Sequence, residues 1–131
     1  MTTRTKVFVC ISCRRQLGGD ENTFDHPGPA LAEGVRALLA DDPTIDVVDV
    51  ECLAVCKRPC TVALAGDGKW TYVIGDLDNA LHCNDVAAAA RAYAKSENGI
   101  VPWKERPVTF RKGVISRIPP VEKPARPEAA E

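Results

Sequence analysis

Six cysteines, arranged in two close groups and one outlier, constrain this chain of 131 residues more than any other feature. The first group has the spacing C-x2-C and the second has C-x3-C-x3-C, and the positions are Cys10, Cys13, Cys52, Cys56, Cys60 and Cys83. A spacer of two or three residues can turn the chain back, so that two thiolates face one ion. Four thiolates in a tetrahedral array suit zinc or an iron–sulfur cluster. The spacing therefore predicts a metal or cluster site.

The cellular compartment decides whether such cysteines form disulfides or bind metal. The N-terminus has an apolar stretch of four residues, whereas a secretory signal needs about 7–15 apolar residues. No apolar run approaches the ~20 residues of a membrane helix. We therefore expect a cytoplasmic protein without a membrane partner, where structural disulfides are disfavoured. The formal net charge of −1 gives no reason to invoke nucleic acid as a partner.

The hydrophobic pattern predicts strands and helices that alternate at first within one domain. Four strands are expected, at residues 6–10, 45–50, 61–65 and 69–74, and the last two flank a Gly-Asp-Gly turn typical of a hairpin. Helices are expected at residues 29–41 and 84–95, and the polar residues 14–28 read as a loop. Two strands separated by a helix favour a parallel pair. We predict an α/β domain with a mixed four-stranded sheet and two main helices, which cover one face or both.

The first two predicted strands each lead directly into a cysteine group. Cys10 ends the first strand, and Cys52 follows the second. Adjacent parallel strands would bring both groups to the same end of the sheet, which is the physical argument for one shared site. The alternative is that several cysteines are merely small buried hydrophobes, and we favour this for Cys83, which stands alone at a helix start.

Basic residues crowd the two cysteine groups. They are Arg14, Arg15, Lys57 and Arg58. Nearby positive charge lowers the pKa of a thiol and would offset the negative charge of a four-thiolate cluster. A solvated loop is the alternative interpretation of each of these side chains. His26 and His82 have no partner at ligand spacing, so we expect them to be ordinary surface residues.

The composition changes beyond residue 99. Residues 100–118 form a basic arm that contains Trp103 and Phe110, and residues 119–131 are rich in proline and charge. We expect the final segment to be disordered. The two aromatic side chains are expected to fold back onto their own domain, and the alternative is an arm that packs on a second subunit or a redox partner. The cluster-binding domain would then cover residues 1–99.

Several segments resemble known iron–sulfur proteins. Residues 51–59 resemble the C-L-x-x-C-x-x-x-P loop of thioredoxin-like [2Fe–2S] ferredoxins and of the related cluster subunit of respiratory NADH dehydrogenases. In those proteins the first cysteine pair also follows the first strand, but it is more widely spaced, and the proline comes one residue later. Residues 55–64, 69–72 and 99–107 look more specifically like a bacterial family known only as predicted metal-binding proteins of unknown function.

The resemblance implies a thioredoxin-like fold of the ferredoxin variant that holds a [2Fe–2S] cluster. Carried onto the matching positions, the ligands are Cys10, Cys13, Cys52 and Cys56. Cys60 is a fifth candidate, which could replace Cys13 or act as a redox-active or substitute thiol beside the cluster. Pro59 matches the place where thioredoxin folds often carry a cis proline. The resemblance also implies a redox partner protein and, as in many such ferredoxins, a homodimer.

Three functions are compatible with these residues. The first is an electron carrier or redox partner with a [2Fe–2S] cluster, and the second is a zinc-binding or metal-handling module that uses the same thiolates. The third is a thioredoxin-like dithiol oxidoreductase that uses Cys10 and Cys13. The third function gives no role to the other cysteines. The next predicted helix also starts about fifteen residues after the Cys10/Cys13 pair, whereas a helix N-terminus usually lowers the pKa of the attacking thiol. No other catalytic arrangement is evident, so we expect a non-catalytic electron-transfer or metal-binding protein.

Overall fold

The computed structural model describes residues 5–12, 15–16, 24–54, 60–78 and 81–121. Its main sheet has five strands in the order β4-β1-β5-β6-β7. The bounds are β1 Thr5–Cys10, β4 Ile45–Val50, β5 Val62–Gly66, β6 Thr71–Ile74 and β7 Val114–Ile118. β1 pairs with β4 in parallel, and every other pair is antiparallel. The mixed sheet is therefore confirmed, but it has one more strand than the sequence predicts.

The fifth strand comes from the basic arm. β7 pairs with β6 along its length, and a bulge lies between Val73 and Ile74. Its side chains are half-buried or exposed, so its sequence carries little of the apolar signal by which strands are recognised. An antiparallel pair of two-residue strands, β2 Arg15–Gln16 and β3 Phe24–Asp25, lies within the segment predicted to be a loop.

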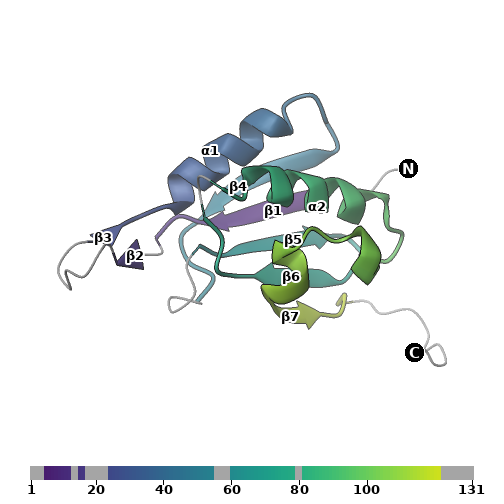
Figure 1. Ribbon diagram of the computed structural model, residues 1–131. Helices are drawn as coiled ribbons and strands as arrows, with labels where there is room; N and C mark the ends of the chain where they lie inside the picture. The colour runs from purple at the N-terminus through teal and green to yellow at the C-terminus, as the bar shows by residue number, and fades with distance from the viewer. Residues whose placement is uncertain (1–4, 13–14, 17–23, 55–59, 79–80, 122–131) are drawn as a thin grey trace.

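Both main helices cover one face of the sheet, as Figure 1 shows. α1 spans Gly28–Leu38 and α2 spans Cys83–Lys95, close to the predicted ranges. Apolar side chains of the two helices and of the facing strand positions form the core; among them are Val7, Val9, Leu31, Val35, Val62, Leu64, Val86 and Tyr93. None of the helices in the described residues is long and apolar enough to span a membrane.

The basic arm folds back onto its own domain. It forms the short helix η1, Trp103–Glu105, then α3, Thr109–Lys112, and finally β7. Phe110 is buried in the core, and the Thr109 hydroxyl donates a hydrogen bond of 3.0 Å to Asp85 of α2. Trp103 stays on the surface. The expectation that the aromatic residues fold back thus holds fully for Phe110 and in part for Trp103.

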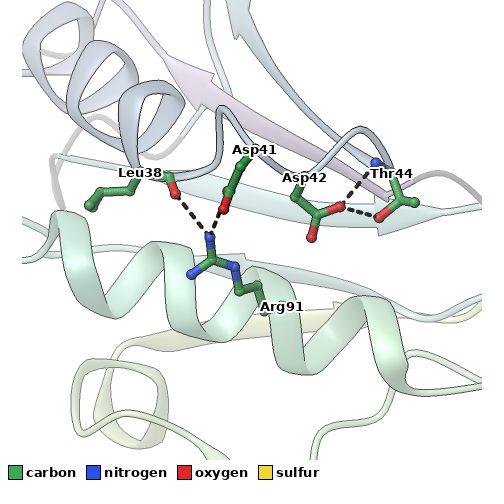
Figure 2. Close-up of polar contacts among 5 residues, drawn as sticks. All are labelled: Leu38, Asp41, Asp42, Thr44 and Arg91. Atoms are coloured by element: carbon green, nitrogen blue, oxygen red, sulfur yellow. Dashed lines mark hydrogen bonds and ion pairs between the residues drawn. The ribbon is translucent and has the colours of Figure 1, made fainter.

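The turn between α1 and β4 is braced by side chains of α2 and of the turn itself (Figure 2). Arg91 of α2 donates to the Leu38 carbonyl oxygen at 2.9 Å and lies 3.4 Å from the Asp41 carboxylate. Asp42 accepts hydrogen bonds from the Thr44 hydroxyl and amide, which lower the pKa of its carboxyl group. These contacts hold the turn that leads from α1 into β4.

The far end of α2 is closed by a buried lysine. Lys69 follows the β5–β6 turn, and its Nζ donates to the carbonyl oxygens of Tyr93 and Ala94 at 3.2 Å each. These are among the last carbonyls of the helix, which lack partners within it. Burial lowers the pKa of the Lys69 ammonium group. The hydrogen bonds to the helix end compensate the charge that is taken out of water.

Tyr93 predicts a loss of stability at alkaline pH. Its hydroxyl donates to the Trp70 carbonyl oxygen at 2.5 Å, and burial, followed by the nearby Tyr72, raises its pKa well above the ordinary value of 10.0. The folded protein therefore keeps this proton when the unfolded chain has lost it, so the stabilisation is complete below about pH 10 and declines above it. We expect the stability advantage of the wild type over Tyr93→Phe to shrink as the pH rises from about 10 to 12.

The measurement is urea unfolding of both proteins at several pH values. The variant also loses one hydrogen bond, worth about 1 kcal/mol at every pH below the transition. The difference between the two proteins isolates Tyr93 from lysine and cysteine groups that titrate in the same range. A constant difference across that range would contradict the prediction.

Candidate metal centre

The candidate centre lies at the end of the sheet where β1 and β4 both finish. Cys10 of β1 is in register with Val50 of β4, and the Ile11 amide donates to the Val50 carbonyl oxygen at 2.9 Å. Cys52 follows Val50 by two residues. The predicted convergence of the two strand ends is therefore confirmed, and it brings Cys10 and Cys52 to one edge of the molecule.

Cys10 is held in a closed environment. Its side chain is 1% exposed, and its Sγ lies 3.9 Å from both the Ser12 hydroxyl and the Glu51 carbonyl oxygen. The Ser12 hydroxyl also donates a hydrogen bond to the Glu51 carbonyl oxygen. This contact ties the segment after β1 to the segment after β4, so that the two cysteine-bearing loops are joined next to Cys10.

Cys52 is exposed and accepts a hydrogen bond at sulfur. The Ala54 amide donates to Cys52 Sγ at 3.1 Å. Ala54 has a φ of 63°, in the left-handed region that costs a non-glycine residue roughly 1–2 kcal/mol. The turn that carries this strain points a backbone donor at the sulfur. Such hydrogen bonds stabilise negative charge on sulfur and help to set the potential of iron–sulfur clusters.

The N-terminus of α1 packs against the backbone of Cys10. A Cβ atom added at Gly28, the first residue of α1, would lie 2.0 Å from the Cys10 carbonyl oxygen and 2.8 Å from Ile11 Cα. The absence of a side chain therefore permits this close approach. A loop separates Cys10 from α1 in the sequence, but the two are in contact in the fold. The positive end of the helix dipole therefore lies at the candidate centre, where it favours negative charge.

Cys60 lies on the other side of β1 and faces the core. The backbone groups of Cys60 and Leu77 form two hydrogen bonds, of 3.0 and 3.1 Å. The Cys10 amide donates to the carbonyl oxygen of Thr61, the residue after Cys60, at 3.0 Å. Its side chain is fully buried and belongs to the hydrophobic core cluster. Cys60 is thus close to Cys10 along the sheet, but its thiol is packed among apolar side chains.

Cys83 packs between the two helices. A Cβ atom at Gly34 of α1 would lie 2.5 Å from Cys83 Sγ, which shows how closely the thiol fits there. Burial, followed by the charge of Asp78, raises the pKa of this thiol. Cys83 therefore has the packing role that its isolated position predicts. Nearby, His82 Nδ1 accepts a hydrogen bond of 2.8 Å from the Asp78 amide, and His26 is exposed.

Several predicted site residues lie outside the described residues. They are Cys13, Cys56, Arg14, Lys57, Arg58 and Pro59, and Arg15 is described only as backbone in β2. Within the described part of the chain, no group of three or more His, Cys, Asp or Glu side chains is placed to hold a metal ion. The geometry thus brings two of the four predicted ligands to one edge of the sheet, and the ligand roles of all four stay predictions.

Three residues at this edge were not found from the sequence. Ser12 and Ala54 carry no signal for the contacts that they make, because both depend on the neighbouring loop. Gly28 lies between Pro27 and Pro29. This pattern predicts the start of a helix, but it does not predict which residues the helix contacts. The close approach of α1 to Cys10 is visible only in three dimensions.

Comparison with known proteins places the chain in a family. A family model described as "Protein of unknown function (DUF1636)" matches residues 7–120. The chain belongs to this family. No curated protein shows significant similarity to it in sequence.

Solved structures with a similar fold include a thioredoxin-like [2Fe–2S] ferredoxin from Aquifex aeolicus. One structure has a TM-score of 0.55 and 20% identity, over 91% of this chain and 97% of the ferredoxin. A second, of the wild-type ferredoxin, has a TM-score of 0.52 and 18% identity, over 86% and 97% of the two chains. At this level of identity the likeness establishes the fold. This member of the DUF1636 family therefore has the thioredoxin-like fold of the ferredoxin variant, as the resemblance implied.

Proposed function

We propose that this protein holds a [2Fe–2S] cluster at the shared end of β1 and β4 and acts as a small electron carrier or redox partner. The parallel pairing of these strands carries the proposal, because it brings Cys10 and Cys52 together from distant parts of the sequence. The proposed ligands are these two residues with Cys13 and Cys56, each of which follows one of them within four residues. A bound cluster would supply reversible one-electron transfer.

The surroundings of the two described cysteines suit a negatively charged centre. The Ala54 amide donates to Cys52 Sγ, and α1 presents its positive end beside Cys10. In the proposal, the basic side chains of Arg14, Arg15, Lys57 and Arg58 add positive charge around the cluster, and Pro59 shapes the loop that carries Cys56. The fold shared with thioredoxin-like [2Fe–2S] ferredoxins supports the same cluster type.

The proposal extends to the cellular setting. We infer a cytoplasmic protein that exchanges electrons with a redox partner protein and assembles as a homodimer. Neither nucleic acid nor a membrane has a part in it. The arm of residues 100–118 belongs to the same domain as residues 1–99, because it supplies β7 to the sheet and Phe110 to the core. A disordered tail over residues 119–131 stays a prediction.

A dithiol oxidoreductase is the second candidate, because one observation favours it. A helix start usually activates such a thiol. The start of α1 lies against the Cys10 backbone in space, although not in sequence. The burial of Cys10 argues against it, since an attacking thiol is accessible to its substrate and Cys10 is 1% exposed. We therefore rank this function below the cluster protein.

Elemental analysis of anaerobically purified protein tests the proposal. We expect about two iron atoms and two sulfides per chain, and visible absorption that bleaches with dithionite. Zinc at about one atom per chain without iron would replace the proposal with a zinc or metal-handling module that uses the same thiolates. A metal-free protein that reduces insulin disulfides would replace it with the dithiol oxidoreductase.

A further inference from the structure

The basic arm presents an aromatic ring and several cations that the proposed cluster does not use. Trp103 in η1 is 59% exposed, although it is a large aromatic side chain. The guanidinium groups of Arg106 and Arg111 lie 5.7 and 5.9 Å from the centroid of its ring, within the range of cation–π attraction. Lys104 and Lys112, which follow Trp103 and Arg111 in the sequence, are exposed. We call these five residues the Trp103 patch.

The two arginines of the patch are held in place by neutral groups. Arg106 donates to the Val101 carbonyl oxygen at 2.8 Å and to the Tyr72 hydroxyl at 3.2 Å. Arg111 donates to the carbonyl oxygens of Trp103 and Lys104 at 3.0 and 3.2 Å. Side chains that are already ordered lose less conformational entropy when a partner binds. The patch is therefore preorganised while its positive charge is retained.

No carboxylate neutralises this charge within the described part of the chain. Neither Arg106 nor Arg111 forms an ion pair there, whereas Arg36 pairs with Asp49 and Arg91 with Asp41. Residues 100–121 contain five basic residues and one acidic residue. Since the whole chain has a net charge of −1, the rest of it carries an acidic excess. Residues 100–121 thus carry a local excess of positive charge.

We propose that the Trp103 patch is the docking surface for the acidic face of a partner protein. Tryptophan and arginine are the side chains most enriched at the energetic centres of protein interfaces. Ordered guanidinium groups without a counter-charge are suited to carboxylates. A nucleic acid fits less well, because nucleic-acid-binding domains are basic overall. In addition, the ring on which a base would stack already has two guanidinium groups beside it.

The test uses fluorescein-labelled poly-L-glutamate as the acidic probe and oligo-dT of equal charge as its counterpart, both followed by anisotropy with the full chain. We expect the wild type to bind poly-L-glutamate more tightly than oligo-dT. The Lys104→Gln/Lys112→Gln variant should weaken poly-L-glutamate binding about tenfold, because both lysines are exposed cations of the patch. Trp103→Ala should weaken it by a similar factor.

A matched control removes the same charge elsewhere. Lys6→Gln/Lys95→Gln neutralises two exposed lysines outside the patch and should leave the affinity within about twofold. In a Trp70→Phe background, in which Trp103 is the remaining tryptophan, poly-L-glutamate should protect the indole from acrylamide quenching. Unchanged thermal unfolding of each variant excludes misfolding as the cause of weaker binding.

Three results would overturn the inference. Tighter binding of oligo-dT would identify a nucleic-acid surface, and equal losses in the control and patch variants would show that only the overall charge matters. Sedimentation that shows a dimer lost in Trp103→Ala would identify a second copy of this chain as the occupant. None of these measurements requires the metal centre, so the docking surface and the proposed function can fail separately.

Discussion

Replacing Cys10 or Cys52 by alanine is expected to reduce the bound iron from about two atoms per chain to background. The two residues come from the adjoining ends of parallel strands, and each contributes one of the four proposed thiolates. A cluster that has lost one thiolate has an open iron site that water can attack. Iron, sulfide and the visible spectrum of anaerobically purified variants provide the measurement.

Two other cysteines provide matched controls for this experiment. Cys83 packs between α1 and α2 and Cys60 lies in the core, so alanine at either position should leave the iron content unchanged. The Cys60 variant should lose about 1–2 kcal/mol of unfolding free energy, because it leaves a small cavity. Iron loss in the Cys83 variant, or retention in both the Cys10 and Cys52 variants, would contradict the site. Iron loss in the Cys60 variant as well as in the Cys10 and Cys52 variants would identify Cys60 as the ligand that replaces Cys13.

Gly28→Ala is expected to be the most destabilising small substitution near the centre. The added methyl group would lie 2.0 Å from the Cys10 carbonyl oxygen, so α1 and β1 would have to move apart. Backbone atoms cannot escape by a change of rotamer, and we expect a loss of about 3 kcal/mol or more. Because the clash falls on Cys10 itself, the variant should also bind less iron. Urea unfolding and metal analysis of the same preparation measure both effects.

Gly68→Ala separates this steric effect from the general cost of replacing glycine. Gly68 has a φ of 72° in the β5–β6 turn, and an added Cβ would meet no atom within 4 Å. The expected cost is therefore the conformational term alone, about 1–2 kcal/mol. Equal losses in the two variants would mean that α1 does not press on the Cys10 backbone.

The positions of the first strands and of the main helices could be predicted because their signals are local. β4 lies at the residues that the run of β-branched side chains indicates, and α1 begins within one residue of the predicted start. The order of these elements favours a parallel pair, and that pairing places Cys10 and Cys52 at one edge. A shared cysteine site could therefore be predicted from the local patterns of the strands and helices and from their order in the chain.

β7 could not be predicted in the same way. Its residues alternate weakly and are mostly exposed, and they become a strand because the edge of β6 offers unpaired backbone groups. The contact between α1 and Cys10 could not be predicted either, because a loop separates them in the sequence. Sequence distance counts the residues of the intervening loop, whereas Gly28 and Cys10 are in contact in the fold.

The amino-acid sequence by itself determined the order of strands and helices and the cysteine spacing, because both depend on residues within a few positions of each other. The tertiary structure decided which thiols face the strand ends and which face the core. Cys60, which sequence spacing groups with Cys52 and Cys56, is buried among apolar side chains, whereas Cys52 is exposed and accepts a hydrogen bond. The direction of each side chain depends on segments packed against it from distant parts of the chain.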